Sequence, residues 1–226
     1  MRITRIERQK KRPDRVSIYA DGEFLTGVSR ETLLRAALRV GDEISQDLVN
    51  TLQDEESLFA ARNSALRLLS VRPRAERELR DRLREKEFSE THIGRVVDDL
   101  KRAELVNDAA FARTYIRNAL VIRPVGEARI RQKLLFLGVD RSTVEEAVRE
   151  TLGQVDMVAV ARETARKFLR RTRTTGKESD PQKVRQRLTA HLSRRGYSWN
   201  TISAVLTSLH GSSSGEEGNE QGGFRY

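Results

Sequence analysis

Hydrophobic and polar residues alternate only near the start of the chain. The alternating apolar residues lie on either side of Asp21-Gly22 and are Val16, Ile18 and Phe24. An Asp-Gly dipeptide tolerates the positive φ angles of a tight turn, so the pattern predicts a β-hairpin. Ile3 and Ile6, in the preceding run, predict a third strand beside it.

A short helix is predicted directly after the hairpin. Ser29 is a suitable N-cap, because its hydroxyl can accept a hydrogen bond from a free N–H of the first turn. The helix is expected to end near Gly41, and its apolar residues are Leu33, Leu34, Ala37 and Leu38. Residues 1–53 are therefore predicted to form a small α+β domain.

Helical periodicity replaces the alternation from about Asp54 to about Leu209. Three segments within this region align without a gap: LRDRLREKEFSETHIGRVV from Leu79, IRQKLLFLGVDRSTVEEAV from Ile130 and LTAHLSRRGYSWNTISAVL from Leu188. Each has a residue suited to cap a second helix, and these residues are Ser89, Asp140 and Ser198. Each segment thus predicts a helix, a tight turn and another helix.

The turn in each segment needs a residue that ends the first helix. Gly138 and Gly196 suit this position, because glycine adopts the left-handed conformation without steric cost. The first segment has Glu87 at the same position, which predicts a weaker helix end.

A further apolar helix precedes each segment, and a proline stands between them at Pro73, Pro124 and Pro181. Proline is favoured in the first turn of a helix, and Asp180-Pro181 is a good cap and start. The predicted fold is therefore mainly α, an elongated array of three tandem three-helix repeats behind the α+β domain. The repeats are predicted at residues 54–108, 109–153 and 154–210, followed by a disordered tail at 211–226.

Composition narrows the possible functions. The 226 residues include 43 Lys and Arg against 33 Asp and Glu, a net charge of +10 that favours an anionic partner such as nucleic acid. The lack of cysteine excludes disulfides, thiolate metal sites and cysteine nucleophiles. No apolar run has the length of a membrane span, so we expect a cytoplasmic protein that does not associate with membranes.

Positive charge is concentrated in the third repeat. From Arg162 to Arg195 the chain has twelve Lys and Arg against Glu163, Glu178 and Asp180, a local balance of +9. A face that binds DNA phosphates or an acidic protein is predicted there, with a solvated charged surface as the alternative. Its residues are Lys167, Arg170, Arg171, Arg173, Arg185, Arg187, Arg194 and Arg195. The first four are expected in a loop longer than its counterparts in the other repeats.

Two other charged regions are weaker candidates for binding. A possible secondary site on the approach to the hairpin comprises Arg8, Lys10, Lys11, Arg12 and Arg15. A charged strand edge that avoids pairing with other chains is the alternative explanation. The run SVRPRAERELRDRLREKEF mixes both signs at helical spacing, as at Glu76 and Arg80, and predicts a salt-bridged surface.

Catalysis has little support in the sequence. His92, His191 and His210 are far apart and lack the spacing of metal ligands, so they are expected to be ordinary surface or core residues. Trp199 could stack on a base, but packing is the favoured interpretation. We expect no enzymatic activity, no metal and no cofactor.

Several segments carry a family resemblance. The runs RPRAERELRDRLREKEFSETHIGRVVDDLKRAELVNDAAFARTYIRN, GEARIRQKLLFLGVD and LSRRGYS closely resemble the RecX family of recombinase regulators. The opening ITRIERQKKRPDRVSIYADGEFLTGVS is similar to the N-terminal extension of its longer members, so the resemblance covers Ile3 to about Leu209. Glu87 and Glu104 stand where the family often has glycine, which concerns the sharpness of two helix ends and not the fold.

The resemblance implies a non-enzymatic, monomeric regulator in DNA repair, recombination and the SOS response. Such a protein binds the RecA recombinase filament on single-stranded DNA and inhibits its recombinase, ATPase and co-protease activities. The basic face of the third repeat would then contact the filament or its DNA. The residues themselves leave two alternatives open, a helical-repeat module that binds nucleic acid directly and a scaffold for another acidic protein.

Overall fold

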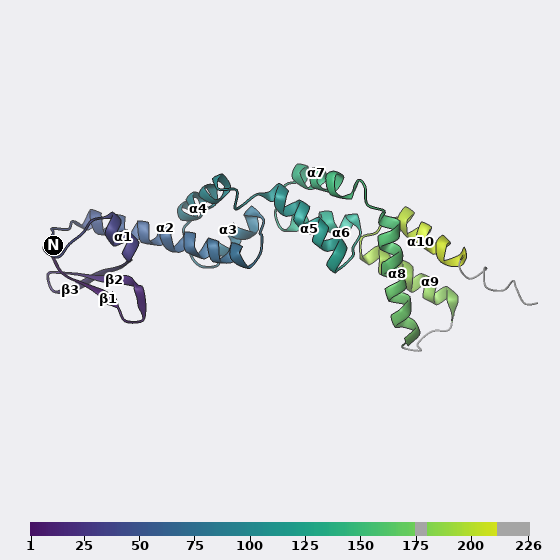
Figure 1. Cartoon of the computed structure of the whole chain (residues 1–226), viewed down its shortest axis with the longest axis horizontal. Coiled ribbons are helices and arrows are strands. Elements are labelled where there is room, and N and C mark those ends of the chain that lie inside the picture. The colour runs from purple at the N-terminus through teal and green to yellow at the C-terminus, as the bar shows by residue number, and fades with distance from the viewer. Residues whose placement is uncertain (175–179, 212–226) are drawn as a thin grey trace, which may run out of the picture. The chain divides into compact units, whose positions relative to one another are not determined.

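The computed structural model describes residues 1–174 and 180–211, without the side chains of residues 173, 174, 210 and 211. The chain divides into two compact units, residues 1–106 and residues 107 onward. Figure 1 shows the order of the elements along the chain. Residues 212–226, nearly all of the predicted tail, lie outside the described residues.

The N-terminal unit begins with a three-stranded antiparallel sheet in the order β1-β2-β3. Its strands are β1 (Ile3–Gln9), β2 (Arg12–Ala20) and β3 (Glu23–Ser29). Ile18 of β2 pairs with Ile6 on one side and Thr26 on the other. Asp21 and Gly22, between β2 and β3, have φ angles of 51° and 91°. The predicted hairpin and its third strand are confirmed.

Helix α1 (Arg30–Arg35) follows the sheet and is shorter than the sequence predicts. Its predicted N-cap is confirmed, because Ser29 Oγ accepts a hydrogen bond from Thr32 N at 3.1 Å. The helix ends well before Gly41, since Ala37 adopts a left-handed φ of 53°. An alanine in this conformation cannot continue a right-handed helix.

Helix α2 (Gln46–Val71) contributes to two hydrophobic cores. Its first turns place Val49 and Leu52 in the core beneath the sheet, together with Ile18 and its neighbours. Its later turns place Ala61 and Ala65 in the core of the first repeat. The boundary predicted between residues 53 and 54 falls within this helix, so the α+β domain and the first repeat share one continuous element.

Two shorter helices complete the first repeat, α3 (Glu76–Arg84) and α4 (Glu90–Arg102). Their core residues recur at helical spacing and are Leu79, Leu83, Ile93, Val96, Val97 and Leu100. Burial of each large aliphatic side chain contributes about 1.5–3 kcal/mol relative to exposure. The periodic positions of the sequence are therefore the positions that hold the repeat together.

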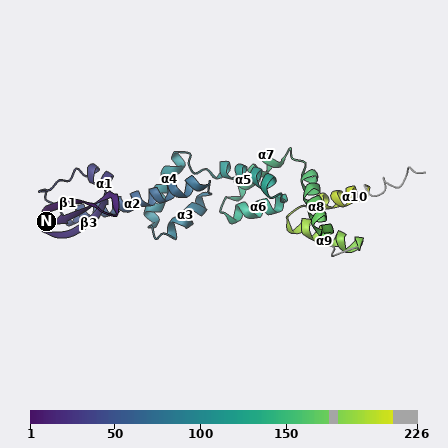
Figure 2. The ribbon, with the colours of Figure 1, turned by 60° about the horizontal axis from the view of Figure 1, so that its bottom comes forward.

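The second unit contains the other two repeats, whose helices can be followed in Figures 1 and 2. The first group is α5 (Asp108–Ile122), α6 (Glu127–Phe136) and α7 (Arg141–Leu152). The second is α8 (Met157–Thr174), α9 (Pro181–Arg194) and α10 (Trp199–Gly211). The predicted class, mainly helical with three three-helix units after a small α+β domain, is confirmed, while the elongated form of the array stays a prediction.

The predicted capping residues begin the third helix of every repeat. Ser89 Oγ accepts from His92 N at 3.2 Å in the first repeat. Asp140 Oδ1 accepts from Thr143 N at 3.0 Å in the second. In the third, Ser198 Oγ accepts at 3.2 Å from the backbone N–H three residues later. All three caps are confirmed.

The turn before each cap uses a left-handed residue in all three repeats. Gly138 and Gly196 have φ angles of 92° and 81°, as predicted. Glu87 has a φ of 64°, so the same turn forms in the first repeat without glycine, and the weaker helix end expected there stays a prediction. Phe88 helps to hold this turn, because it packs against the repeat core and its N–H donates to Leu83 O at 3.4 Å. Core packing thus enforces a conformation that glutamate adopts at a steric cost.

The prolines play two different roles. Pro181 stands in the first turn of α9 behind the N-cap Asp180, as predicted. Pro73 and Pro124 lie outside their helices, two residues before the N-caps Ala75 and Gly126. Neither of these two N-caps makes a side-chain capping hydrogen bond.

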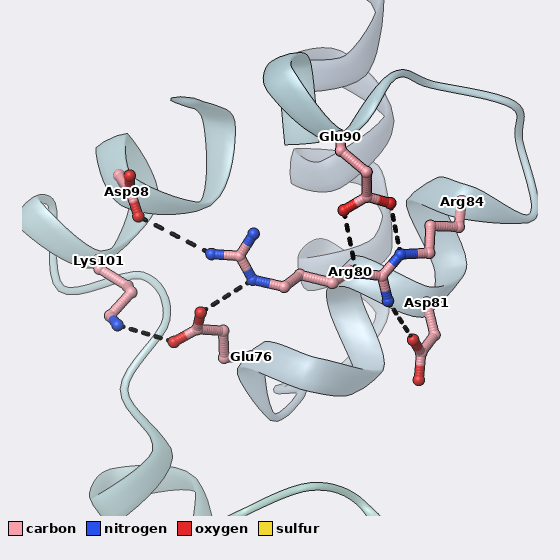
Figure 3. A network of polar contacts seen from close by, with 7 residues as sticks. All are labelled: Glu76, Arg80, Asp81, Arg84, Glu90, Asp98 and Lys101. Carbon is pink, nitrogen blue, oxygen red and sulfur yellow. Dashed lines mark hydrogen bonds and ion pairs between the residues drawn. The ribbon is translucent and has the colours of Figure 1, made fainter. Parts of the chain in front are cut away.

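An ion-pair network joins α3 to α4 in the first repeat (Figure 3). Glu76 Oε1 accepts from Arg80 Nε at 2.9 Å, and Glu76 Oε2 accepts from Lys101 Nζ at 2.7 Å. Burial raises the pKa of Glu76, but the hydrogen bonds of Lys101 and Arg80 outweigh it and hold the pKa below its usual value. The predicted salt-bridged surface is confirmed, and it extends to a second helix.

Candidate functional site: a basic cleft in the third repeat

The basic run of the third repeat lies largely on a helix. Helix α8 continues to Thr174, so Lys167, Arg170 and Arg171 are helical, and the predicted loop is wrong for them. Arg173 is also in the helix, but its side chain lies outside the described residues. Arginine and lysine favour helices nearly as well as alanine, so a basic run does not indicate a loop.

Helix α8 separates its apolar and charged side chains. Ala161 and Ala165 are fully buried in the core of the third repeat, and Phe168 packs against that core. Lys167, Arg170 and Arg171 are exposed. Lys167 Nζ lies 3.7 Å from Glu163 Oε1 one turn earlier, and an exposed pair of this kind contributes only a few tenths of a kcal/mol.

These cations line a cleft of about 320 Å³, which we call the basic cleft. Its cationic residues are Arg123, Lys167, Arg170, Arg171 and Arg195. Phe168 and His191 form an aromatic part of the wall, with ring centroids 4.6 Å apart. The cleft therefore combines positive charge with flat rings.

Arg123 comes from the second repeat and is not among the residues predicted from the sequence. It lies in the connection between α5 and α6, in an Arg-Pro pair that also occurs at Arg72 in the first repeat. Arg72 forms an ion pair with Glu78, six residues later. The equivalent position in the second repeat is Arg129, so Arg123 lacks that neutralising carboxylate. This comparison of repeats is the sequence signal that could have found it.

A backbone junction holds Arg123 beside the third repeat. Gly126 N donates to Arg195 O at 2.8 Å, and Ala128 N donates to Gly196 O at 3.3 Å. These bonds satisfy N–H groups at the start of α6, where no side chain caps the helix. The Arg195 guanidinium also donates to Pro124 O at 2.9 Å, so Arg195 shapes the cleft wall as well as adding charge.

Charge and burial act together on His191. Burial lowers the pKa of His191, and the neighbouring guanidinium groups of Arg195 and Arg194 lower it further. His191 therefore favours its neutral form, in which it serves as a ring surface and not as an additional cation.

Three other predicted cations of the third repeat lie outside the cleft. Arg185, Arg187 and Arg194 are exposed on α9 and do not line the basic cleft. The structure thus brings together four of the eight predicted residues, Lys167, Arg170, Arg171 and Arg195.

The predicted secondary cluster divides into residues with different surroundings. Lys10 and Lys11 form the exposed turn between β1 and β2, and Arg8 and Arg12 are exposed next to it. Arg15 instead forms an ion pair with the buried Glu56 and donates to Gly27 O at 2.8 Å. Arg15 thus links the sheet to α2 and has its hydrogen bonds within the fold.

Two further predictions concern aromatic residues. Trp199 is 67% exposed at the start of α10, so the packing role favoured by the sequence is wrong. His92 is buried, and its Nε2 lies 2.8 Å from Asp54 Oδ1, which agrees with an ordinary core histidine. His210 has its side chain outside the described residues.

A metal site needs clustered ligand side chains, and a membrane span needs a long apolar helix. Within residues 1–174 and 180–211, no group of three His, Asp or Glu side chains is placed to hold a metal ion. No helix in the same ranges has both the length and the apolar character of a membrane span.

Comparison with known proteins identifies the family. The fold is that of a helical-repeat protein with an α+β start, and each part matches a known profile. Residues 1–45 match the regulatory protein RecX N-terminal domain. Residues 61–100, 107–148 and 155–206 match the first, second and third three-helix domains of RecX.

Whole-chain relatives agree with these matches. The regulatory protein RecX of Clostridioides difficile is 34% identical over 92% of this chain and 95% of its own. The regulatory protein RecX of Clostridium acetobutylicum is 31% identical over 92% of this chain and 95% of its own. A crystal structure of regulatory protein RecX has a TM-score of 0.68 at 25% identity, covering 91% of this chain and 98% of its own. The chain therefore belongs to the RecX family, whose members are named regulatory proteins.

Proposed function

We propose that this chain binds the RecA recombinase filament on single-stranded DNA and inhibits its recombinase, ATPase and co-protease activities. Membership of the RecX family supports this proposal. The structural observation that supports it is the basic cleft, where two repeats bring five cationic side chains together. In this proposal the protein acts as a cytoplasmic monomer without a cofactor, in DNA repair, recombination and the SOS response.

The chemistry of the cleft suits a filament of protein on DNA. Such a filament presents phosphate oxygens and protein carboxylates, and the planar guanidinium group of arginine donates two parallel hydrogen bonds to either. Arg173, Arg185, Arg187 and Arg194 would extend this contact along α8 and α9. Bound across neighbouring RecA subunits, the protein would block filament growth or the subunit movements that ATP hydrolysis requires.

The decisive experiment is the ATPase rate of RecA on single-stranded DNA while this protein is titrated at near-physiological salt. We expect inhibition well below one molecule per RecA subunit, because a regulator that blocks growth acts on many subunits at once. If the rate stays unchanged at all ratios, the proposal is wrong.

Charge-reversal variants distinguish a specific role of the basic cleft from an effect of the protein's overall positive charge. The variant Arg123→Glu, Lys167→Glu, Arg170→Glu should inhibit at least about tenfold more weakly, since each lost charge contact costs on the order of 1 kcal/mol. The matched control reverses Arg117, Arg141 and Arg149, which are exposed on α5 and α7 and do not line the cleft. Equal losses in both variants would show that net charge, and not the cleft, is responsible.

A second candidate is a module that binds nucleic acid without a recombinase. The exposure of Trp199 favours it, because an exposed indole can stack on a base. This candidate predicts tight, salt-sensitive binding to bare DNA together with no effect on RecA. The logarithm of its binding constant should fall with the logarithm of salt concentration, with a slope near the number of phosphates neutralised.

A further inference from the structure

A second groove, of about 500 Å³, lies in the N-terminal unit between the sheet, α2 and the turn from α3 to α4. We call it the N-terminal groove and define it by Arg12, Arg67 and Lys86 around the half-buried Phe59. Arg12 belongs to β2, Arg67 to α2 and Lys86 to the turn after α3. Three separate elements thus direct positive charge into one groove.

Glu56 lies in the wall of this groove without opposing that charge. Its carboxylate forms an ion pair with Arg15 and accepts from Ser29 N at 2.6 Å and Thr32 Oγ1 at 3.3 Å. Glu56 is only 8% exposed, and these partners satisfy it inside the fold. Among the described residues that line the groove, Asp14 is the one other carboxylate.

The three groove cations differ from many arginines of the same unit. Within the described residues, no ion pair joins Arg12, Arg67 or Lys86 to a carboxylate, and all three side chains are exposed. By contrast, Arg84 on the adjacent α3 donates to Glu90 at 2.6 Å (Figure 3). Like charges around one groove repel one another, and an anionic ligand would relieve that repulsion.

The remaining lining indicates which anion fits. Helix α2 contributes apolar surface and uncharged polar groups to the groove, namely Phe59, Ala60, Asn63, Ser64 and Leu68. A single nucleic-acid strand has the matching combination, with repeated phosphates, flat apolar bases and hydrogen-bonding base edges. An acidic peptide would use the cations but not the ring. We propose that the N-terminal groove binds single-stranded nucleic acid, with its cations on the phosphates and Phe59 against a base.

The test measures binding of a fluorescein-labelled oligothymidine of about 40 nucleotides, a strand meant to reach both cationic surfaces, to the full chain by anisotropy without recombinase. The variant Arg12→Ser, Arg67→Ser, Lys86→Ser should bind at least about tenfold more weakly. The slope of its log binding constant against log salt concentration should become shallower by about 2, since each phosphate contact on a single strand contributes about 0.7.

A matched variant controls for net charge. Arg30→Ser, Arg39→Ser, Arg77→Ser removes three exposed cations of the same unit that do not line the N-terminal groove. This variant should keep most of the affinity and of the salt slope. Equal losses in the two variants, or no loss in the groove variant, would overturn the proposal.

Footprinting on the unmodified protein gives a second measurement that does not depend on a variant. Amine acetylation followed by mass spectrometry should show that oligothymidine protects Lys86. Lys101, which is also exposed in the first repeat but lies outside the groove, is the internal control and should react equally with and without the strand. Equal acetylation of Lys86 with and without saturating oligothymidine would rule the groove out. Because no recombinase is present, either result is independent of the role proposed for the basic cleft.

Discussion

Gly126 and Gly196 are the residues at which the second and third repeats meet backbone to backbone. A Cβ added to Gly126 would lie 2.1 Å from the carbonyl carbon of Gly196. That distance is far inside van der Waals contact, and its obstacle is main chain that cannot rotate away. The absence of a side chain at Gly126 is therefore what allows the start of α6 to use the carbonyls of another repeat.

The first prediction follows from this contact. Gly126→Ala should lower the free energy of unfolding by about 1–3 kcal/mol, the usual cost of forcing extra volume into a packed site. Urea denaturation followed by circular dichroism measures the change. Hydrogen exchange should also be faster at the N–H groups of Gly126 and Ala128, because their acceptors would move away.

Gly94 supplies the matched control for that substitution. It lies within α4, and a Cβ there would meet nothing within 4 Å. Gly94→Ala should therefore stabilise the protein by about 0.5–1 kcal/mol, since alanine is the better helix former. Unchanged stability and exchange in Gly126→Ala would show that the junction can open without cost.

Contacts between residues close in the chain could be predicted from the sequence, whereas contacts between distant residues could not. Ser89, Asp140 and Ser198 were identifiable as caps because a cap bonds to a backbone group three residues away. The contact of Gly126 with Gly196 joins residues far apart in the chain, and no local pattern marks it. Trp199 illustrates the same limit, since its exposure depends on which surfaces the repeats leave uncovered.

At the scale of elements, Glu56 connects the sheet, α1 and α2. It bonds to Arg15 on β2, to the N-cap residue Ser29 and to Thr32 in α1. The α+β domain thus has a polar link to the helix it shares with the first repeat. Sequence periodicity did not reveal this, because a buried carboxylate on α2 follows neither the apolar nor the exposed pattern.

A substitution at Glu56 removes that link and gives the second prediction. Glu56→Gln should destabilise the protein by about 2–3 kcal/mol, somewhat less than the 3–5 kcal/mol typical of breaking a buried ion pair. The reduction is expected because Arg15 is 24% exposed and can regain water. Thermal and urea unfolding measure the loss. Glu55→Gln, at the neighbouring position, should change stability by no more than about 0.5 kcal/mol, and a similar effect at both positions would contradict the argument.

At the scale of the whole molecule, charge is distributed unevenly between the two units. Residues 1–106 contain 22 Lys and Arg and 20 Asp and Glu, whereas residues 107–226 contain 21 and 13. The sequence therefore located the basic cleft approximately, because the excess there is large. Of the cations that define the N-terminal groove it indicated only Arg12, because Arg67 and Lys86 come close to Arg12 only through folding in a nearly neutral unit.

Two cationic surfaces on one chain lead to the last prediction, which concerns the length of the ligand. A strand long enough to reach both surfaces binds the second one at a high effective concentration, so its affinity should exceed that of a short strand beyond the statistical gain in sites. We expect an oligothymidine of about 40 nucleotides to bind at least about tenfold more tightly per site than one of about 10. The Arg12, Arg67, Lys86 variant should lose this advantage and retain the affinity for short strands that the basic cleft supplies. A length dependence that is identical in wild type and variant would mean that the two surfaces do not act on one strand.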